Sequence, residues 1–221
     1  MSQIFRYALD ELNQNIEPIK GKHAWCKLCG LEVLSVIPEK RAKHWRHKAK
    51  EGCDPWWENI TEWHLSWQNS FPEECREIIC QDPVTQEKHR ADIITKNGMV
   101  IEVQHSSINV DERQAREKYY LSIYGKMIWI VHIYDDQNCR RYSDFRITLD
   151  IADMIGGRKL SLTDLRGKFF ERWAGSITAS GVYVIFDYGN KDLLWLRKKT
   201  GEKYEFDIVS RKRLIEQNGG R

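Results

Sequence analysis

Two carboxylates and an amide interrupt two apolar, β-rich runs that flank an Asn-Gly turn signal within residues 89–106. Asp92 lies in the first run, and Glu102 and Gln104 lie two residues apart in the second. Carboxylates among apolar residues are unfavourable unless a positive charge compensates them, and a divalent cation supplies that charge. The alternative is that the three residues lie on solvent-facing strand edges and bind nothing.

The length of the turn decides whether the two carboxylates meet. A two-residue loop at 97–98 would put Asp92 and Glu102 on opposite faces of the hairpin, whereas a three-residue loop at 96–98 puts them directly opposite each other. The three-residue form needs a left-handed last residue, and the sequence places Gly there. We therefore predict the longer loop, with Asp92, Glu102 and Gln104 on one face and the opposed Cβ atoms about 5 Å apart.

Oxygen ligands of this kind suit Mg²⁺ or Mn²⁺, which leave coordination positions open for water and a substrate phosphate. Gln104 cannot accept a proton as a basic residue would, so activation of a water would depend mainly on the metal. Glu62 and His64, before the hairpin, are further candidates for the same face, with ordinary packing or solvation as the alternative. Arg113 and Arg116, after it, are candidates to hold a phosphate, although helix arginines are often only solvated.

A second group has the residue types of a zinc site. Cys26 and Cys29 form a Cys-x-x-Cys pair, and His44 and His47 follow after fourteen intervening residues. Two thiolates and two imidazoles suit tetrahedral zinc, and one helix face presents histidines three residues apart. Cys53 is an alternative to either histidine, and a redox pair or free thiols is the alternative to zinc. The segment has few large apolar residues, which favours a metal-stapled module.

Basic residues crowd the second half of this module, although the net charge of the whole chain is only +3. Lys43 and Arg46 are predicted to contact nucleic-acid phosphates, with the solvated face as the alternative. Two shorter basic clusters lie at 197–199 and 211–213. The other basic residues of the module are Lys40, Arg41, Lys48 and Lys50.

Periodicity predicts the elements that hold these residues. We expect, in order, a weak helix at 4–13, a helix beginning near Asn59 or Thr61, a strand at 76–80, the hairpin, a helix at 109–124 and a buried strand at 127–133. Asn109 or Asp111 caps the longer helix and Gly125 ends it. Later segments predict helices at 150–154 and 162–173, a hairpin of strands 182–187 and 193–197, a strand at 204–209 and a basic tail. This order predicts an α/β fold with a mixed sheet.

The expected organisation is an N-terminal helix at 1–20, a zinc-binding module at 21–55, a core at 56–135 and a C-terminal extension at 136–221. The chain of 221 residues has 41% hydrophobic and 30% charged residues, and it contains no apolar run near the ~20 residues of a membrane span. Six cysteines without an apparent export signal argue against a disulfide framework. We therefore expect a soluble, cytoplasmic protein without a membrane partner.

The combined pattern resembles the PD-(D/E)xK nuclease core, and more specifically the competence protein CoiA-like family. The family motifs correspond to Cys26-x-x-Cys29, to His44-Trp-Arg-His47, to the Arg-Ala-Asp-Ile run at 90–93 and to the Ile-Glu-x-Gln-x-Ser run at 101–106. Arg116-x-x-x-Tyr120 and Trp129-Ile130 also fit. The match covers roughly residues 22–135.

The resemblance implies a restriction-endonuclease-like core beside a zinc-binding module. It implies that Asp92 and Glu102 hold Mg²⁺ or Mn²⁺, that Gln104 replaces the usual lysine and that Arg116 contacts nucleic acid. The expected function is a metal-dependent nuclease acting on DNA, an endonuclease rather than an exonuclease, with structural Zn²⁺. The alternatives are a nucleic-acid-binding protein that has kept the fold without catalysis, and a metal-stapled docking protein.

Overall fold

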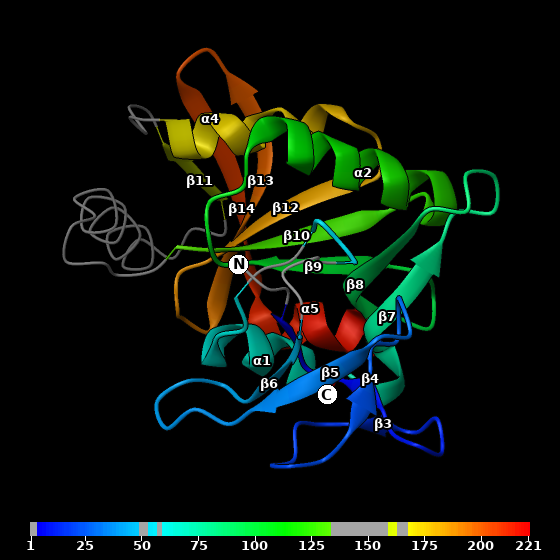
Figure 1. Ribbon diagram of the computed structural model, residues 1–221. Helices are drawn as coiled ribbons and strands as arrows, with labels where there is room; N and C mark the ends of the chain where they lie inside the picture. The colour runs from blue at the N-terminus through cyan, green and yellow to red at the C-terminus, as the bar shows by residue number, and fades with distance from the viewer. Residues whose placement is uncertain (1–3, 49–52, 57–58, 134–158, 163–167) are drawn as a thin grey trace.

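The computed structural model describes residues 4–48, 53–56, 59–133, 159–162 and 168–221, which form a small N-terminal sheet beside a larger sheet with helices on both faces (Figure 1). In this part of the chain, no helix is both long enough and apolar enough to cross a membrane. The mixed class predicted from the sequence is confirmed, because strands dominate both sheets and both parallel and antiparallel pairs occur.

The N-terminal sheet has six short strands in the order β1-β6-β5-β4-β2-β3. They are β1 (Ile4–Phe5), β2 (Ala8–Leu9), β3 (Asn15–Ile16), β4 (Ala24–Trp25), β5 (Glu32–Val36) and β6 (His44–His47). All neighbours in this sheet are antiparallel. A small core of Phe5, Ala8, Ala24, Val33 and Trp45 holds the strands together.

The expected helix at 4–13 is wrong, because a turn at Asp10 folds this segment into strands. Asp10 Oδ1 accepts hydrogen bonds from the backbone amides of Leu12 and Gln14, both at 2.9 Å, and Asn13 has φ 58°. Asp and Asn favour such turns because their short side chains bond to the local backbone and tolerate the left-handed region. The described residues 4–20 therefore do not form a helix: their strands belong to the same sheet as β4, which directly precedes Cys26.

The large sheet has eight strands in the order β11-β14-β13-β12-β10-β9-β8-β7. β10 runs parallel to β9 on one side and to β12 on the other, and the other neighbours are antiparallel. The strands are β7 (Arg76–Gln81), β8 (Lys88–Ile94), β9 (Val100–Gln104), β10 (Met127–His132), β11 (Lys159–Leu162), β12 (Val182–Asp187), β13 (Asp192–Thr200) and β14 (Lys203–Ser210).

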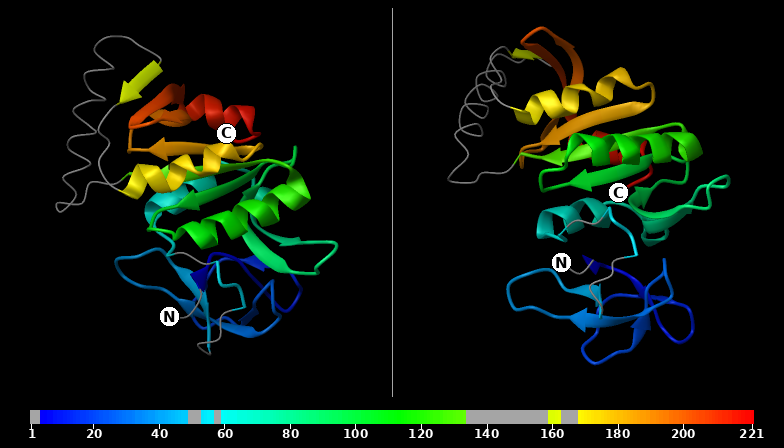
Figure 2. Two further views of the ribbon diagram at one scale, coloured as in Figure 1. Left: turned by 90° about the horizontal axis from the view of Figure 1, so that it is seen from above. Right: turned by 45° about the horizontal axis from the view of Figure 1, so that its top comes forward.

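Helices cover both faces of this sheet (Figure 2). α2 (Val110–Tyr124) and α4 (Lys168–Ala174) pack on one face, where Tyr120 and Trp173 join the strand residues Trp129 and Phe186. α1 (Glu62–Asn69) and α5 (Arg211–Gln217) pack on the other, where Trp67 and Ile215 join the strand core. Two short 3₁₀ turns, η1 (Glu73–Cys75) and η2 (Ser176–Thr178), connect elements.

Local signals set the ends of the two longer helices. Thr61 caps α1 by accepting a hydrogen bond from the amide of His64, and Asn109 caps α2 by accepting one from the amide of Glu112. α2 ends at Gly125, which has the left-handed φ of 71°. These caps were among the predicted ones, and they satisfy amides that have no partner inside a helix.

The C-terminal part of the chain completes the same sheet. The predicted second hairpin is confirmed as β12 and β13, and β14 pairs with β13. β12 pairs with β10 along its whole length, so the expected boundary at 135 falls within one sheet. The basic tail begins as α5, α4 lies in the expected helical region, and the helix expected at 150–154 lies outside the described residues.

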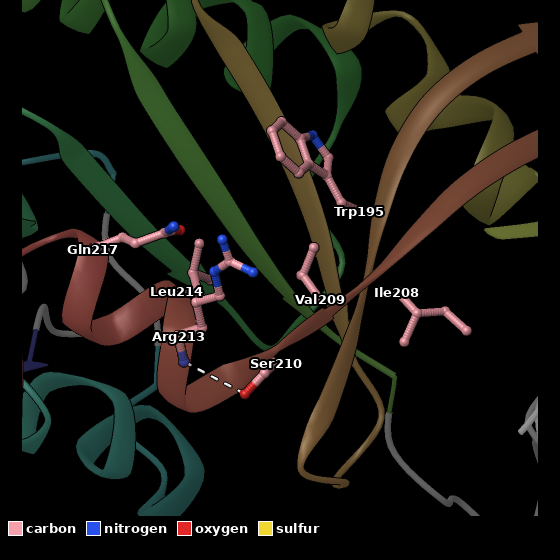
Figure 3. A pocket seen from close by; sticks show the side chains of 7 residues that line it. All are labelled: Trp195, Ile208, Val209, Ser210, Arg213, Leu214 and Gln217. Carbon is pink, nitrogen blue, oxygen red and sulfur yellow. Dashed lines mark hydrogen bonds between the residues drawn. The ribbon is translucent and has the colours of Figure 1, made fainter. Parts of the chain in front are cut away.

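A cavity of about 270 Å³ lies beside β13, β14 and α5 (Figure 3). Its walls are mainly apolar, with Arg213 and Gln217 at α5 as longer polar members. None of the predicted site residues lines it. The lining residues are Trp195, Ile208, Val209, Ser210, Arg213, Leu214 and Gln217.

Substitution of two glycines can test the close approach of the backbone segments that precede β10 and β12. Gly181 has φ +89°, and a Cβ there would lie 2.4 Å from the carbonyl oxygen of Gly125, whereas Gly189 has φ +82° and open space around it. We expect Gly189→Ala to destabilise the protein by about 1 kcal/mol through its backbone alone. Gly181→Ala should destabilise it by about 2 kcal/mol more, because the contact forces the backbone apart. Denaturant unfolding of both variants measures the difference, and equal losses would contradict the close approach.

Candidate active site and metal centre

The hairpin of β8 and β9 has the three-residue loop predicted from the sequence. Thr95 and Met99 close it, with the amide of Thr95 donating to the carbonyl of Met99 at 3.0 Å. Gly98 has φ +74°, as its place in this loop requires. The register pairs Ile93 with Ile101 and Ile94 with Val100, so the next residues along the two strands, Asp92 and Glu102, lie opposite each other.

Asp92 sits where the two strands begin to separate. In an unbroken antiparallel ladder the amide of Val103 would donate to a backbone carbonyl of β8, that of the residue two positions before Ile93. Here it donates to Asp92 Oδ2 at 2.8 Å, while the amide of Asp92 donates to Glu102 Oε1 at 3.3 Å. The two carboxylates therefore take over backbone hydrogen bonds at the opening of the hairpin, which fixes them relative to both strands.

Helices approach the two acids from opposite faces of the sheet. His64 of α1 lies 3.0 Å from Asp92 Oδ1 through Nε2, and Arg116 of α2 donates from Nη1 to Glu102 Oε2 at 3.0 Å. The Glu102 side chain is 3% exposed and that of Asp92 is 22% exposed, so solvent reaches the pair from the Asp92 side. Of the two candidates before the hairpin, Glu62 is exposed and His64 contacts Asp92.

The pKa values of the two carboxyl groups are shifted in opposite directions. Burial would raise the pKa of Asp92, but the charge and hydrogen bond of His64 and the amide of Val103 outweigh it, so this pKa is lowered. Burial and then the negative charge of Asp92 raise the pKa of Glu102 to about 8, although Arg116 opposes the rise. The raised pKa of Glu102 shows that ionising both carboxyls side by side is unfavourable despite Arg116, and a further cation beside the pair would relieve that cost.

This pKa predicts a pH-dependent stability difference in metal-free protein. Because the folded pKa of Glu102, about 8, lies above its usual 4.5, the group stabilises the fold fully below pH 4.5 and loses that contribution as pH rises through 8. Glu102→Gln removes the titration, so the free energy of unfolding of wild type minus that of the variant should fall between pH 5 and 8. The slope is at most about 1.4 kcal/mol per pH unit. Urea unfolding in a chelating buffer measures it, and a flat difference would contradict the buried acid.

The parallel strands β9, β10 and β12 all end beside this site, at Gln104, His132 and Asp187. Asp187 Oδ2 accepts hydrogen bonds from the indole nitrogens of Trp63 at 2.9 Å and of Trp67 at 2.8 Å. These bonds dock α1 onto the strand ends and so position His64, which lies between the two tryptophans. Sequence patterns predicted the tryptophan face of α1, but Asp187 itself, 120 residues away, carried no recognisable signal.

The end of β9 is also held in place. Gln104 shares the face of Glu102, and its Nε2 donates to the carbonyl of Ser106 at 3.0 Å. The ring of His132 stacks on Trp63 with centroids 4.2 Å apart, and His105 lies 5.0 Å from His132. Burial lowers the pKa of His105 and lowers that of His132 to about 4, so both rings are neutral near pH 7.

Of the four residues predicted to contact phosphate, two are buried in the structure and two are exposed. Arg116 is buried between Glu102 and Glu112 rather than facing solvent, and Arg113 is buried against Glu117 and Ser176. The alternative that these helix arginines are only solvated is therefore wrong, because both are paired with acids, and a role of either at a phosphate stays a prediction. Lys43 and Arg46 are both exposed on the N-terminal module, and Lys43 pairs with Glu17 at 2.7 Å.

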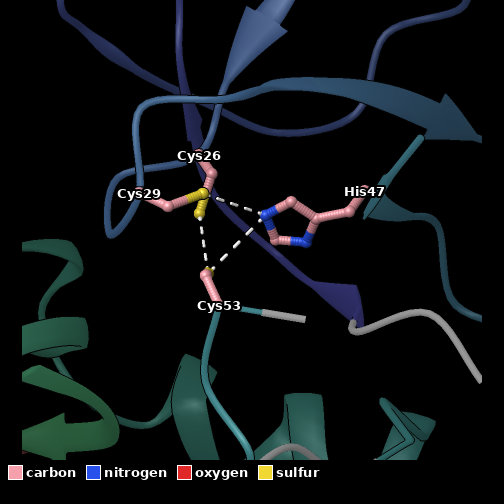
Figure 4. A group of neighbouring side chains, drawn as sticks. All are labelled: Cys26, Cys29, His47 and Cys53. Atoms are coloured by element: carbon pink, nitrogen blue, oxygen red, sulfur yellow. Dashed lines mark hydrogen bonds between the residues drawn. The ribbon is translucent and has the colours of Figure 1, made fainter. Parts of the chain in front are cut away.

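Four side chains of the N-terminal module converge on one point (Figure 4). Cys26, Cys29, His47 and Cys53 place their ligand atoms within 4.8 Å of one another. Cys26 and Cys53 sulfurs lie 3.6 Å apart, and His47 Nε2 lies 3.3 Å from Cys29 and 3.6 Å from Cys53. Ligand atoms around tetrahedral zinc lie about 3.5–3.8 Å apart at ordinary Zn–S and Zn–N lengths. The group therefore fits zinc in both residue type and spacing.

His44 does not belong to this group. The structure places it on a strand, β6, and not on the helix that its spacing from His47 suggested. Residues three apart on a strand face opposite sides, so only His47 points to the cysteines. His44 Nδ1 instead lies 3.0 Å from the carbonyl of Ala42. Cys53, the alternative to either histidine, takes the fourth position.

Residues 80–152 match the family model described as competence protein CoiA, nuclease-like domain. The chain carries a CoiA nuclease-like domain. Asp92, Glu102, Gln104 and Arg116 all lie within this CoiA segment, whereas the cysteine group lies outside it. Searches of curated proteins and of solved structures gave no match. The CoiA nuclease-like domain indicates a nuclease and therefore a nucleic-acid substrate.

Proposed function

We propose that the protein is a metal-dependent nuclease that hydrolyses phosphodiester bonds in DNA, with Asp92 and Glu102 holding Mg²⁺ or Mn²⁺. One observation carries the proposal: the two acids lie opposite each other at the opening of the β8–β9 hairpin, within the CoiA nuclease-like segment. The raised pKa of Glu102 supports it, because a cation beside the pair would relieve their repulsion.

The residues around the two acids would each have a separate role in the reaction. A divalent cation held by Asp92 and Glu102 would polarise a phosphoryl group and lower the pKa of a bound water. The Nε2 of Gln104 donates to the Ser106 carbonyl, and its Oε1 would be the atom that orients an attacking water. Because an amide cannot take a proton, Gln104 positions and does not act as a base. His64 keeps Asp92 ionised through its charge and hydrogen bond, and Arg116 holds Glu102 in place.

The N-terminal module would supply binding. We assign Zn²⁺ to Cys26, Cys29, His47 and Cys53, which replaces the earlier expectation of His44. The exposed Lys43 and Arg46 of the same module would contact phosphates, a role that predicts salt-sensitive affinity. An endonuclease of this kind would work in the cytoplasm, where thiol ligands stay reduced.

The decisive experiment incubates purified protein with circular and linear DNA, single- and double-stranded, in Mg²⁺, Mn²⁺ or EDTA. Cleavage of circular DNA that requires Mg²⁺ or Mn²⁺ would establish an endonuclease. Cleavage only from ends would make it an exonuclease, and cleavage of RNA alone would move the substrate assignment. Undiminished cleavage in EDTA would refute the metal-dependent mechanism.

A second function has support of its own: a nucleic-acid-binding protein of the same fold without catalysis. Arg116 already occupies one oxygen of Glu102, and Gln104 stands where a proton-transferring residue would be useful. That function predicts DNA binding that persists in EDTA, weakens with salt and leaves every substrate intact. The same incubations, read by gel shift as well as by cleavage, separate the two.

A further inference from the structure

The cysteine group is joined to the strand that carries Asp92. Arg90, two residues before Asp92 on β8, donates from Nη2 to the sulfur of Cys26 at 3.5 Å. Its guanidinium also lies 4.1 Å from the ring centroid of Phe5, in the core of the N-terminal sheet. One side chain of β8, the strand that carries Asp92, therefore reaches into the N-terminal module and contacts a proposed zinc ligand.

A second link begins at another member of the group. Asp54 follows Cys53 directly and is 1% exposed. Its Oδ2 accepts a hydrogen bond from the backbone amide of Arg90 at 2.9 Å, and its Oδ1 lies 2.9 Å from Nδ1 of His89. Trp56 stacks on the His89 ring at 3.3 Å and closes this contact from outside. The backbone of β8 is thus held by the residue next to a proposed zinc ligand.

A third link joins the N-terminal sheet to β7, at the residue that lies opposite Asp92. On β7 the pairs of Arg76 with Ile93 and Ile78 with Ala91 leave Glu77 opposite Asp92. Glu77 is 3% exposed with φ 45°, a strained backbone for a residue with a side chain. Its carboxylate accepts hydrogen bonds from the amides of Arg6 at 2.7 Å and Tyr7 at 2.9 Å. The N-terminal sheet therefore holds the neighbour of Asp92 in a conformation that it would not adopt alone.

We propose that Arg90, Asp54 and Glu77 are positioning residues that couple metal occupancy of the cysteine group to the position of Asp92. Zinc bound to Cys26 and Cys53 would hold the sulfur that Arg90 contacts and the residue next to Asp54. It would also hold the N-terminal sheet, whose amides bind Glu77. Loss of zinc frees these ends, so β8 relaxes and Asp92 leaves its place opposite Glu102. The N-terminal module thereby acts as an integral support of the nuclease-like domain. The effect on a catalytic ion rests on the function proposed above.

Coupling of this kind is reciprocal, which gives a sharp test. If zinc improves the affinity of the Asp92–Glu102 pair for Mn²⁺ by some factor, Mn²⁺ must improve the affinity of the cysteine group for zinc by the same factor. We measure free Mn²⁺ by electron paramagnetic resonance during titration of the full chain, zinc-loaded or stripped of zinc by chelation and gel filtration. We expect Mn²⁺ to bind about tenfold more weakly to the stripped protein.

Two variants test whether the named residues carry the coupling. Arg90→Gln removes the contact to Cys26, and Asp54→Asn weakens the contacts to His89 and the Arg90 amide. When the zinc-loaded and zinc-stripped forms of each variant are compared, most of the tenfold difference in Mn²⁺ affinity should be lost. Arg197→Gln is the matched control, since Arg197 also lies 4.1 Å above an aromatic ring, Trp195, but on β13. It should retain the full difference. Coupling that persists in Arg90→Gln and in Asp54→Asn overturns the assignment.

Hydrogen exchange separates failure of this inference from failure of the proposed function. The amides of Arg90 and Asp92 should exchange at least about tenfold faster in the stripped protein, while those of Leu194 and Trp195 on β13 should not, which excludes global unfolding. Equal exchange at Arg90 and Asp92 with and without zinc overturns the coupling. If Mn²⁺ binds neither form, the proposed catalytic ion is refuted, and zinc-dependent exchange at these amides still supports the link.

Discussion

Asp92→Asn and Glu102→Gln are each expected to lower the rate of Mg²⁺-dependent DNA cleavage by about a thousandfold or more. Both substitutions keep the size of the side chain and an oxygen that accepts the local amide hydrogen bond, from Val103 or from Asp92. What they remove is the negative charge of the carboxylates that would hold a divalent cation. Single-turnover cleavage at saturating protein measures the loss without interference from weaker binding.

Asp82→Asn provides the matched control for these variants. Asp82 also accepts backbone hydrogen bonds, from Val84 and Thr85, but it lies partly exposed in the turn between β7 and β8, away from the acid pair. It should cleave at the wild-type rate. DNA affinity of the two acid variants should be unchanged or higher, because each loses a negative charge near the substrate. Wild-type cleavage by Asp92→Asn and Glu102→Gln would refute the assignment of the site.

Cys53→Ser is expected to weaken zinc binding by about a hundredfold or more, whereas His44→Ala should leave it unchanged. Cys53 has its sulfur within the group of four ligand atoms, and His44 lies outside that group on β6. Because the core of the N-terminal sheet is small, loss of the metal should also lower the unfolding temperature in the variant. Zinc retained during competition with a coloured chelator measures the affinity.

The pair of variants also decides between two ligand sets. Zinc that is lost in His44→Ala and kept in Cys53→Ser would restore the set expected from the sequence. Zinc lost in both would mean that His44 supports the fold of β6 indirectly, which the unfolding temperature at saturating zinc would reveal. His47→Ala should behave as Cys53→Ser does, because both ligand sets include His47.

The sequence alone predicted those parts of the site that depend on neighbours in the chain. The opposition of Asp92 and Glu102 follows from the length of one loop, and a glycine at its last position determines that length. The caps at Thr61 and Asn109 follow equally from the first turn of each helix. Such features are predictable because the hydrogen bonds that define them join residues only two to four positions apart.

Tertiary structure decided which partners reach the site from a distance. His44 and His47 were expected on a helix, yet pairing of β6 with β1 and β5 makes this segment a strand and turns only His47 toward the cysteines. Packing of α2 on the sheet buries Arg116 against Glu102, a partner that the spacing of the helix did not indicate. Asp187 and Arg90 hold α1 and the N-terminal module through contacts 120 and 64 residues apart. No periodicity encodes such contacts, because they depend on how two faces pack and not on spacing along either segment.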